Sequence, residues 1–375
     1  VNAHTHNPMT LLRGIADDLP LKVWLQQHIW PVESAVMGPA FVADGVTLAI
    51  AEMLRGGTTC CNENYFFPDV QAATYRKHGF RARVGLPVID FPTAWASSDD
   101  EYFDRAGQVH DQWRDDPLIA TAFAPHAPYT VNDANFERVR MLADQLDIPV
   151  HLHLHETAQE VLQSVDQYGQ RPIARLDRLG LVNDRLIAVH MTQLTDAEIH
   201  LCAERGVSVV HCPESNLKLA SGFCPVCVLQ RAGVTLAIGT DGCASNNDLD
   251  MFSENRTAAI LAKAVADDAT ALDAATTLRA STLGGARALG FGERIGSIEV
   301  GKQADLVCVD LSALETQPLH NVLSQLVYAT GRQQVSDVWI AGKPKLVQRE
   351  LVGMDLPGII ANARQWRERI RHIRA

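Results

Sequence analysis

Two histidines close to the start of the chain, His4 and His6, have the spacing of metal ligands on one strand face. Alternate side chains of a β-strand point to the same side, so a His-x-His pair presents both imidazoles together. The following Asn7-Pro8 favours a turn out of the strand. Two adjacent imidazoles suit a divalent metal ion, whereas the motif alone is also found as an ordinary surface feature.

A second histidine-rich strand is predicted over Pro149–His155, where alternation places His151, His153 and His155 on one face. We predict His153, near the strand end, as a third metal ligand, because two imidazoles alone would leave the metal without a third strong ligand. Local hydrogen bonding explains His151 and His155 equally well. Glu156 follows directly, and an acid at that place beside a metal would carry protons.

An aspartate ends the last predicted strand, in Ile238-Gly239-Thr240-Asp241-Gly242. A carboxylate delivered by an apolar strand is unfavourable unless it is paired or binds a cation. With the three histidines, Asp241 completes a set that suits Zn²⁺ and leaves room for a water molecule, and iron or manganese would also accept these ligands. His190, which ends Leu186–His190, could orient that water or fill a further coordination position.

The chain offers little for a second metal. Some barrel hydrolases bridge two ions through a modified lysine, but the fourth predicted strand ends Ala122-Phe123-Ala124-Pro125-His126 and has no lysine. We therefore predict one metal ion. Cys224 and Cys227 form a Cys-x-x-Cys pair that lacks the partner spacing of a structural zinc site, so we predict apolar packing for both thiols.

These polar residues fall at the ends of short apolar runs that alternate with amphipathic stretches. The predicted strands are Val1–His6, Thr58–Glu63, Ala82–Val88, Ile119–Pro125, Pro149–His155, Leu186–His190, Val207–His211 and Val234–Thr240, and the predicted helices include Asp44–Arg55, Asp133–Gln145, Pro172–Leu179 and Thr195–Glu204. The alternation predicts an α/β fold, a (β/α)8 TIM-type barrel. A doubly wound open sheet would alternate similarly, but no Gly-x-Gly-x-x-Gly follows the first strand. In a barrel these residues meet where the active sites of barrel enzymes lie, at the carboxyl ends of the strands.

Beyond Leu289 the pattern becomes that of a small β-sandwich domain. Gly296–Asp310 resembles a turn-rich pair of strands, Val335–Ile340 and Pro344–Val347 a hairpin, and Ile359–Arg374 an arginine-rich helix. We therefore predict a metal-dependent catalytic barrel over residues 1–289, the C-terminal part of a small β-sandwich over 290–350 and a C-terminal helix over 351–375.

The composition limits the possible partners. The 375 residues carry a formal net charge of −11, which argues against nucleic acid or an anionic membrane surface as the main partner. No apolar run reaches the length of a membrane span, and nothing resembles a secretory signal. Eight irregularly spaced cysteines indicate free thiols and a cytoplasmic protein.

Several longer motifs resemble those of the amidohydrolase superfamily, most closely its branch of 5′-methylthioadenosine/S-adenosylhomocysteine deaminases and related chlorohydrolases. The motifs are Asn2-Ala3-His4-Thr5-His6-Asn7-Pro8-Met9, Leu11-Leu12-Arg13-Gly14, Ala124-Pro125-His126-Ala127-Pro128-Tyr129, Ser215-Asn216-Leu217-Lys218-Leu219 and Gly239-Thr240-Asp241-Gly242-Cys243-Ala244-Ser245-Asn246-Asn247. The resemblance runs over essentially the whole chain. It implies a metal-dependent barrel with a composite β-sandwich built from both chain ends, so we expect that an N-terminal sandwich segment precedes Val1 and is missing here.

The resemblance also implies roles for individual residues. It places the metal ligands at His4, His6, His153 and Asp241, the proton-transferring glutamate at Glu156, a catalytic histidine at His190, the acid that holds the ribose hydroxyls at Glu33 and a substrate-contacting histidine at His126. Glu156 and Asp241 would contact the substrate as well. Val84-Gly85-Leu86-Pro87 lacks an arginine that some members carry near there, which favours the uncharged methylthio substrate over S-adenosylhomocysteine.

The activity that these residues imply is hydrolytic deamination at C6 of an adenine nucleoside, 5′-methylthioadenosine above S-adenosylhomocysteine or adenosine. The alternatives within the family are guanine or pterin deamination and triazine dechlorination, for which Glu33 would find no ribose diol. A non-catalytic barrel would be free to lose the ligands that are present here. The implied partner is a small-molecule nucleoside, with a homo-oligomer as a further possibility.

Overall fold

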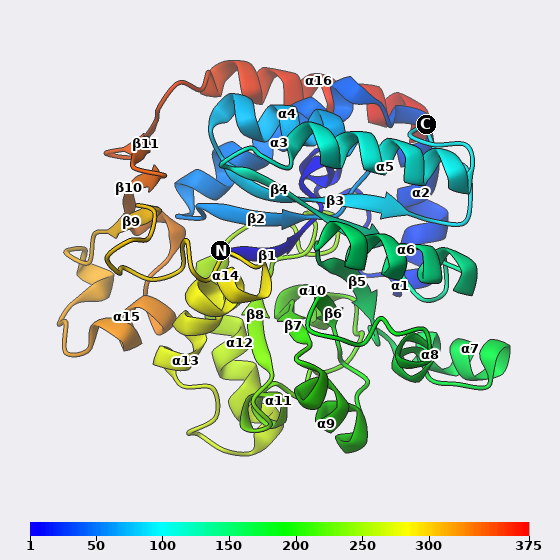
Figure 1. The fold of residues 1–375 in the computed structure, drawn as a ribbon. Helices are drawn as coiled ribbons and strands as arrows, with labels where there is room; N and C mark the ends of the chain where they lie inside the picture. Colours follow the sequence, from blue (N-terminus) through cyan, green and yellow to red (C-terminus); the bar gives the residue numbers. More distant parts are fainter. Residues whose placement is uncertain (375) are drawn as a thin grey trace.

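Eight parallel strands form the centre of the computed structural model, which describes residues 1–374 (Figure 1). In sheet order they are β1 (Asn2–Thr5), β2 (Cys60–Glu63), β3 (Arg81–Val88), β4 (Ile119–Pro125), β5 (Val150–Leu154), β6 (Leu186–His190), β7 (Ser208–His211) and β8 (Thr235–Ile238). Where the chain leaves β8 it meets β1, and the Asp241 N–H donates to the His4 carbonyl oxygen at 3.0 Å. The predicted (β/α)8 barrel is confirmed.

The helices lie outside the strands, as the apolar faces of parallel strands require. They are α1 (Leu21–Val23), α2 (Trp30–Val36), α3 (Pro39–Arg55), α4 (Pro68–His78), α5 (Asp99–Trp113), α6 (Asp133–Leu146), α7 (Ala158–Tyr168), α8 (Pro172–Arg178), α9 (Asp196–Arg205), α10 (Pro213–Lys218), α11 (Val226–Arg231), α12 (Met251–Ala266), α13 (Ala274–Arg279), α14 (Gly285–Ala288), α15 (Val322–Tyr328) and α16 (Leu356–Arg374). Shorter 3₁₀ or π turns are η1 (Asn7–Leu12), η2 (Trp24–Ile29), η3 (Ala280–Gly284), η4 (Leu314–Thr316) and η5 (Arg332–Gln334).

The predicted strand ends differ from the observed ones by a few residues, for local reasons. Two strands, β4 and β6, have the predicted bounds. On β5 the predicted range Pro149–His155 is too long at both ends, and His155 leaves the strand with a left-handed φ of 53°. The predicted helix Asp44–Arg55 starts too late, because Pro39 already begins α3.

A buried arginine ties the amino-terminal end of the barrel to the chain that covers it. Arg83 on β3 is 7% exposed, and its guanidinium donates to the Leu289 carbonyl oxygen at 2.7 and 3.0 Å and to that of Thr121. The guanidinium also lies 4.9 Å from the centre of the Phe291 ring. Burial lowers its pKa to about 10, so it remains a cation at neutral pH. Three carbonyl contacts and an aromatic face thus replace its lost hydration.

Replacing Arg83 with alanine is expected to lower the free energy of unfolding by about 3 kcal/mol, because the Leu289 and Thr121 carbonyl groups lose a charged donor. Urea-induced unfolding measures this change. Arg114, which is exposed on the end of α5, is the matched control, and its alanine variant should change the free energy by less than about 0.5 kcal/mol. Equal losses in the two variants would contradict this assignment.

The C-terminal part forms a separate antiparallel sheet in the order β12-β11-β10-β9, from β9 (Leu306–Val309), β10 (Val335–Ile340), β11 (Lys343–Val347) and β12 (Glu350–Leu351). The predicted hairpin is therefore present. The prediction of two strands over Gly296–Asp310 is wrong for its first half. Gly296 and Gly301 take left-handed φ angles of 93° and 95°, and Ile298 between them is 90% exposed.

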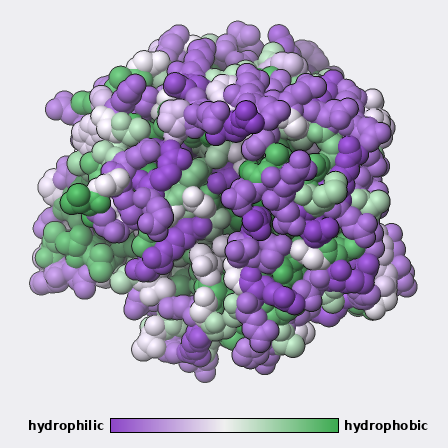
Figure 2. All heavy atoms as spheres, viewed as in Figure 1, coloured by the Kyte–Doolittle hydropathy of each residue, from purple (hydrophilic) through white to green (hydrophobic). Residues whose placement is uncertain are grey.

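Only one layer of the expected sandwich is present among residues 1–374, namely this four-stranded sheet. Apolar side chains are exposed beside it, and Figure 2 shows them gathered at the left edge, over the segment with β9 and α15. Opposite them α16 packs on α3, where the Trp366 indole N–H donates to Asp44 at 2.9 Å (Figure 1). Ala375, the last residue of the predicted C-terminal helix, lies outside the described residues.

No single helix in the described part of the chain has the length and hydropathy of a membrane span. The pair Leu21–Val36 and Pro39–Arg55 has them only when its two helices, bent by 113°, are taken together.

Candidate active site

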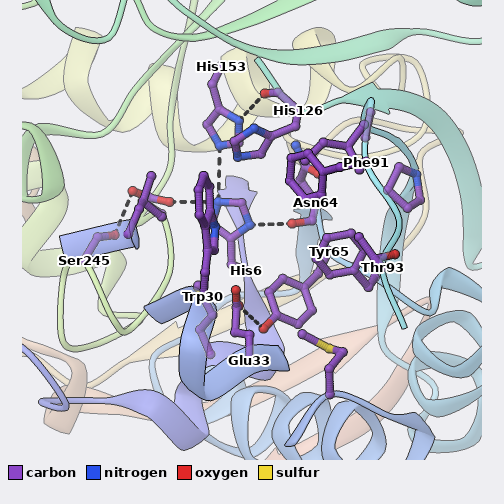
Figure 3. A pocket seen from close by; sticks show the side chains of 18 of the residues that line it. His6, Trp30, Glu33, Asn64, Tyr65, Phe91, Thr93, His126, His153 and Ser245 are labelled. Carbon is purple, nitrogen blue, oxygen red and sulfur yellow. Dashed lines mark hydrogen bonds and ion pairs between the residues drawn. The ribbon is translucent and has the colours of Figure 1, made fainter. Parts of the chain in front are cut away.

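Four side chains from three strand ends converge at the carboxyl end of the barrel. His4 lies on β1 and His6 just after it, His153 lies on β5, and Asp241 follows β8. The Nε2 atoms of His4 and His6 each lie 3.2 Å from Asp241 Oδ1. His153 Nε2 lies 3.2 Å from His6 Nε2 (Figure 3). One possible ligand atom from each residue lies within 4.8 Å of all the others. The four predicted ligands are therefore neighbours.

Each of the three imidazoles is held through its other nitrogen. Nδ1 of His6 donates to the Asn64 carbonyl oxygen, and Nδ1 of His153 donates to that of His126 at 2.6 Å. Nδ1 of His4 lies 2.9 Å from Nε2 of His151. With the proton on Nδ1, each Nε2 presents a lone pair to the centre of the group, which is the tautomer that a metal ligand needs.

The spacing of these atoms fits a zinc ion. Zinc–nitrogen bonds of about 2.0–2.1 Å in tetrahedral geometry separate neighbouring ligand atoms by roughly 3.3 Å, and the closest pairs here lie 3.2 Å apart. Lone pairs of His6 and His153 facing each other at that distance repel unless a cation lies between them. Burial would raise the pKa of Asp241, but its contacts with His4 and His6 hold that pKa well below its usual range. The carboxylate is thus ionised, as a ligand must be.

Two further groups that could move protons lie beside this centre. Glu156 is 5% exposed, and its Oε2 atom lies 4.0 Å from Nε2 of His190. Burial raises the pKa of Glu156 above its usual value, so its carboxyl retains a proton at higher pH than an exposed glutamate does. Glu160, on the first turn of α7, accepts the backbone N–H groups of His155 at 2.9 Å and Glu156 at 2.7 Å. Glu160 therefore fixes the backbone from which Glu156 reaches the site.

Glu33 and His126 lie on the wall of the same cavity (Figure 3). Glu33, on α2, is 7% exposed and accepts a short hydrogen bond from the Tyr65 hydroxyl. Nδ1 of His126 lies 2.9 Å from the Thr130 hydroxyl, which itself donates to the Ala127 carbonyl oxygen. Nδ1 of His126 is therefore the donor, and its Nε2 atom is an acceptor. Tyr65, in the loop after β2, was not predicted, because nothing in the local sequence pairs it with a residue on α2.

The other two histidines of the β5 segment have different places. His151 lies behind His4 and contacts its Nδ1 atom, so it supports a site residue. His155 does not share their face. Its ring lies 3.1 Å from the Gln193 carbonyl oxygen and accepts the Ile173 N–H at 3.0 Å, at the start of α8. The left-handed backbone of His155 turns the ring out of the barrel, which strand alternation could not predict.

The cavity above these groups has a volume of about 540 Å³. Its floor carries three of the four converging residues, His6, His153 and Asp241, with Glu156 and His190, and its outer wall is apolar. Trp30 from α2 and Phe91 from the loop after β3 meet edge to face across this wall, with ring centres 6.1 Å apart (Figure 3). Among the described residues that line the cavity there is no lysine or arginine.

The two cysteines of the Cys-x-x-Cys pair lie elsewhere. Cys224 and Cys227 are 4% and 7% exposed and belong to the apolar core around β5 to β8. Packing thus accounts for both thiols, as predicted.

Comparisons with known proteins agree on one family. A model of the amidohydrolase family matches residues 1–345. A relative from Teredinibacter turnerae, named 5-methylthioadenosine/S-adenosylhomocysteine deaminase, is 49% identical over 370 residues, which are 99% of this chain and 84% of that protein. A relative of the same name from Aquifex aeolicus is 40% identical over 369 residues, 98% of this chain and 85% of that protein.

Solved structures have the same architecture. An adenosine deaminase from Xanthomonas campestris with bound zinc is 87% identical, with a TM-score of 0.98 that covers 99% of this chain and 84% of that one. Atrazine chlorohydrolase from Arthrobacter aurescens, complexed with zinc, is 22% identical with a TM-score of 0.91 over 97% and 86% of the two chains, and shares the fold alone. This chain belongs to the amidohydrolase family, in the branch of the 5-methylthioadenosine/S-adenosylhomocysteine deaminases.

Proposed function

We propose that the protein is a zinc-dependent hydrolase that replaces the C6 amino group of 5′-methylthioadenosine with oxygen and releases ammonia. The observation that carries the proposal is the convergence of three imidazole Nε2 atoms and one carboxylate oxygen at the base of a cavity whose lining includes His6, His153, Asp241, Glu156 and Glu33. The names of the relatives and the bound zinc of the Xanthomonas campestris enzyme support it.

Within this proposal His4, His6, His153 and Asp241 hold one divalent ion. When bound, zinc lowers the pKa of water and so supplies a nucleophile at neutral pH. Nε2 of His190, with Asp241, accepts the proton of the attacking water and orients its oxygen toward C6. In the steps that follow, Glu156 and Asp241 move the protons.

Glu156 donates its proton to ring N1 as the oxygen attacks C6, so the ring accepts the electron pair without becoming an anion. Its raised pKa suits this role, because a buried carboxyl retains the proton that it must give. Collapse of the tetrahedral centre breaks the bond from C6 to the amino nitrogen. Asp241 passes the proton from water to the departing ammonia, and the second water proton returns to Glu156, which balances the reaction.

Glu33 and His126 bind the sugar in this scheme. Tyr65 donates to one carboxylate oxygen of Glu33, which leaves the other free to accept a ribose hydroxyl. Nε2 of His126 accepts a second hydroxyl proton, since Nδ1 is bound to Thr130. Both contacts require a nucleoside, because a free base or a triazine has no ribose hydroxyls.

Replacing Glu33 with alanine is expected to raise KM for 5′-methylthioadenosine by about 10- to 100-fold, since a hydrogen bond to a charged group is lost. The 2′,3′-dideoxy analogue serves as the matched substrate and should show a much smaller change. Steady-state ammonia release measures both. A KM for the ribonucleoside that stays at the wild-type value would contradict the role of Glu33.

The cavity favours an uncharged 5′ substituent. A homocysteine group would bring a carboxylate and an ammonium against Trp30 and Phe91, and the described residues that line the cavity include no lysine or arginine to pair with the carboxylate. We expect kcat/KM for 5′-methylthioadenosine to exceed that for S-adenosylhomocysteine by at least about 10-fold.

The proposed function is tested by ammonia release from 5′-methylthioadenosine, S-adenosylhomocysteine, adenosine and guanine at equal zinc loading. We expect the methylthio nucleoside to have the highest kcat/KM and guanine to be inert. Turnover of guanine alone would overturn the nucleoside assignment, and equal use of the two sulfur nucleosides would overturn the apolar 5′ site.

We also propose residues 1–289 as the catalytic unit. Every residue that lines the cavity lies between His6 and Ser245. Residues 290–350 and the following helix then act on the chemistry only through packing against that unit.

A further inference from the structure

We propose that the adjacent residues Ser215 and Asn216 are positioning residues, which together orient His190 and Asp241, the two side chains that accept the first proton of the attacking water in the proposed reaction. This inference rests on the proposed function for its catalytic consequence. The two residues lie within the motif Ser215–Leu219, to which the mechanism has so far given no role. Neither lines the cavity, and both are buried, with exposures of 0% and 1%.

The topology explains how one dipeptide reaches two strands. Both residues lie on α10, which follows β7 directly, and β7 lies between β6 and β8 in the sheet. Consecutive helical side chains diverge by about 100° around the axis. Ser215 therefore points to the end of β8, and Asn216 to the end of β6. Pro213 at the start of α10, with the bond from the Asn216 N–H to the Cys212 carbonyl oxygen at 3.0 Å, fixes their backbone.

Ser215 holds the carboxylate of Asp241 in one orientation. Its hydroxyl donates to Asp241 Oδ2 at 2.6 Å, and the Ser245 hydroxyl donates to the same oxygen at 2.8 Å. The other oxygen, Oδ1, is the one that faces His4 and His6. The two hydroxyls thus occupy one oxygen and leave Oδ1 for a metal, as a single-oxygen ligand.

Asn216 holds the imidazole of His190 and determines which of its nitrogens carries the proton. Its Oδ1 atom lies 2.8 Å from Nδ1 of His190 and accepts the proton there. Nε2 of His190 is then without a proton, and it is the atom that lies 4.0 Å from Glu156. Asn216 Nδ2 has no partner among the described residues although it is buried. Among the described residues, the side chain of this buried amide therefore has its hydrogen bond through the oxygen, to His190.

The backbone at both receiving residues needs such support. His190 and Asp241 have left-handed φ angles of 75° and 62°, which residues other than glycine rarely adopt. Strained positions of this kind persist only where surrounding contacts determine them. Ser215 and Asn216 supply those contacts from one rigid helical turn.

Two variants with matched controls test the proposal. Zinc affinity is measured by competition with a chromogenic chelator, and kcat and KM by ammonia release from 5′-methylthioadenosine at saturating zinc. We expect S215A to bind zinc about 10- to 100-fold more weakly than the wild type. The control S164A removes the hydrogen bond of another buried serine, on α7, to the Gln170 carbonyl oxygen and should leave zinc affinity unchanged.

For Asn216 we expect N216L to lower kcat by about 10²-fold, with KM and zinc affinity within about threefold of the wild type. N216D keeps an acceptor oxygen of the same size and should restore most of the turnover with an altered pH profile. The control N255L replaces another buried asparagine, on α12, and should leave kcat unchanged.

Wild-type zinc affinity in S215A, or wild-type kcat in N216L, would overturn the proposal. Should N216L fail to fold, N216D decides alone, because an unchanged pH profile in that variant would contradict the contact with His190. The zinc measurement on S215A needs no substrate, so it remains decisive even if the proposed function proves wrong.

Discussion

Replacing Glu156 with glutamine is expected to lower kcat for 5′-methylthioadenosine by about 10²- to 10⁴-fold while zinc content stays at one ion per chain. The amide keeps the shape of the side chain and can still form a hydrogen bond to ring N1. It has no acidic proton to transfer, so the ring would have to accept the electron pair as an anion. Rapid-quench ammonia assays and metal analysis on the same sample measure the two quantities.

The result is informative because Glu156 does not belong to the four converging ligands. Its Oε2 atom lies 4.0 Å from Nε2 of His190. E156D keeps a carboxyl that is one methylene shorter and should recover part of the rate. A variant E156Q that retains more than half of the wild-type kcat would remove Glu156 from the mechanism.

Replacing His153 with alanine is expected to abolish measurable turnover and to weaken zinc binding by more than the roughly 10- to 100-fold that loss of an outer-shell partner costs. His153, on β5, is the one proposed ligand that comes from the side of the barrel opposite β1, which provides His4 and, just after it, His6. Without it the remaining ligands lie on one side of the ion. Chelator competition gives the affinity, and ammonia release gives the rate.

His155 provides the matched control for this second prediction. It is two residues along the same chain segment, but its ring bonds to the chain around Gln193 and Ile173. H155A should therefore keep wild-type zinc affinity, whatever happens to its stability. A loss of zinc affinity in H155A as large as that in H153A would contradict the assignment of His153, and not His155, as the ligand from this segment.

Much of the barrel could be predicted from the sequence because its strands are short apolar runs with polar residues at their ends. Ile119–Pro125 and Leu186–His190 have the predicted bounds, since each run is interrupted at both ends by polar or turn-forming residues. The segment Leu21–Val36 was not predicted. It interrupts its helix with the π turn η2, and no simple period of apolar residues describes such a segment.

The site itself was predictable to the extent that strand alternation and strand order determine it. His4, His6, His153 and Asp241 follow from those two rules, and they lie together. Ser215, Asn216 and Tyr65 were not predicted to support the site, because their partners lie far away in the chain and no local pattern indicates the contact. Glu160 was not predicted either, although its partners, the backbone N–H groups of His155 and Glu156, are close to it in the chain. The roles of Glu33 and His126 depended on family resemblance rather than on spacing.

The central claim is that one zinc ion, held by His4, His6, His153 and Asp241, makes this protein a nucleoside deaminase. Titration of zinc into the metal-free protein, with ammonia release from 5′-methylthioadenosine as the signal, tests it most directly. We predict no release without metal and a linear rise that stops at one equivalent of zinc. Full activity in the metal-free protein, or a rise that continues to two equivalents, would contradict it.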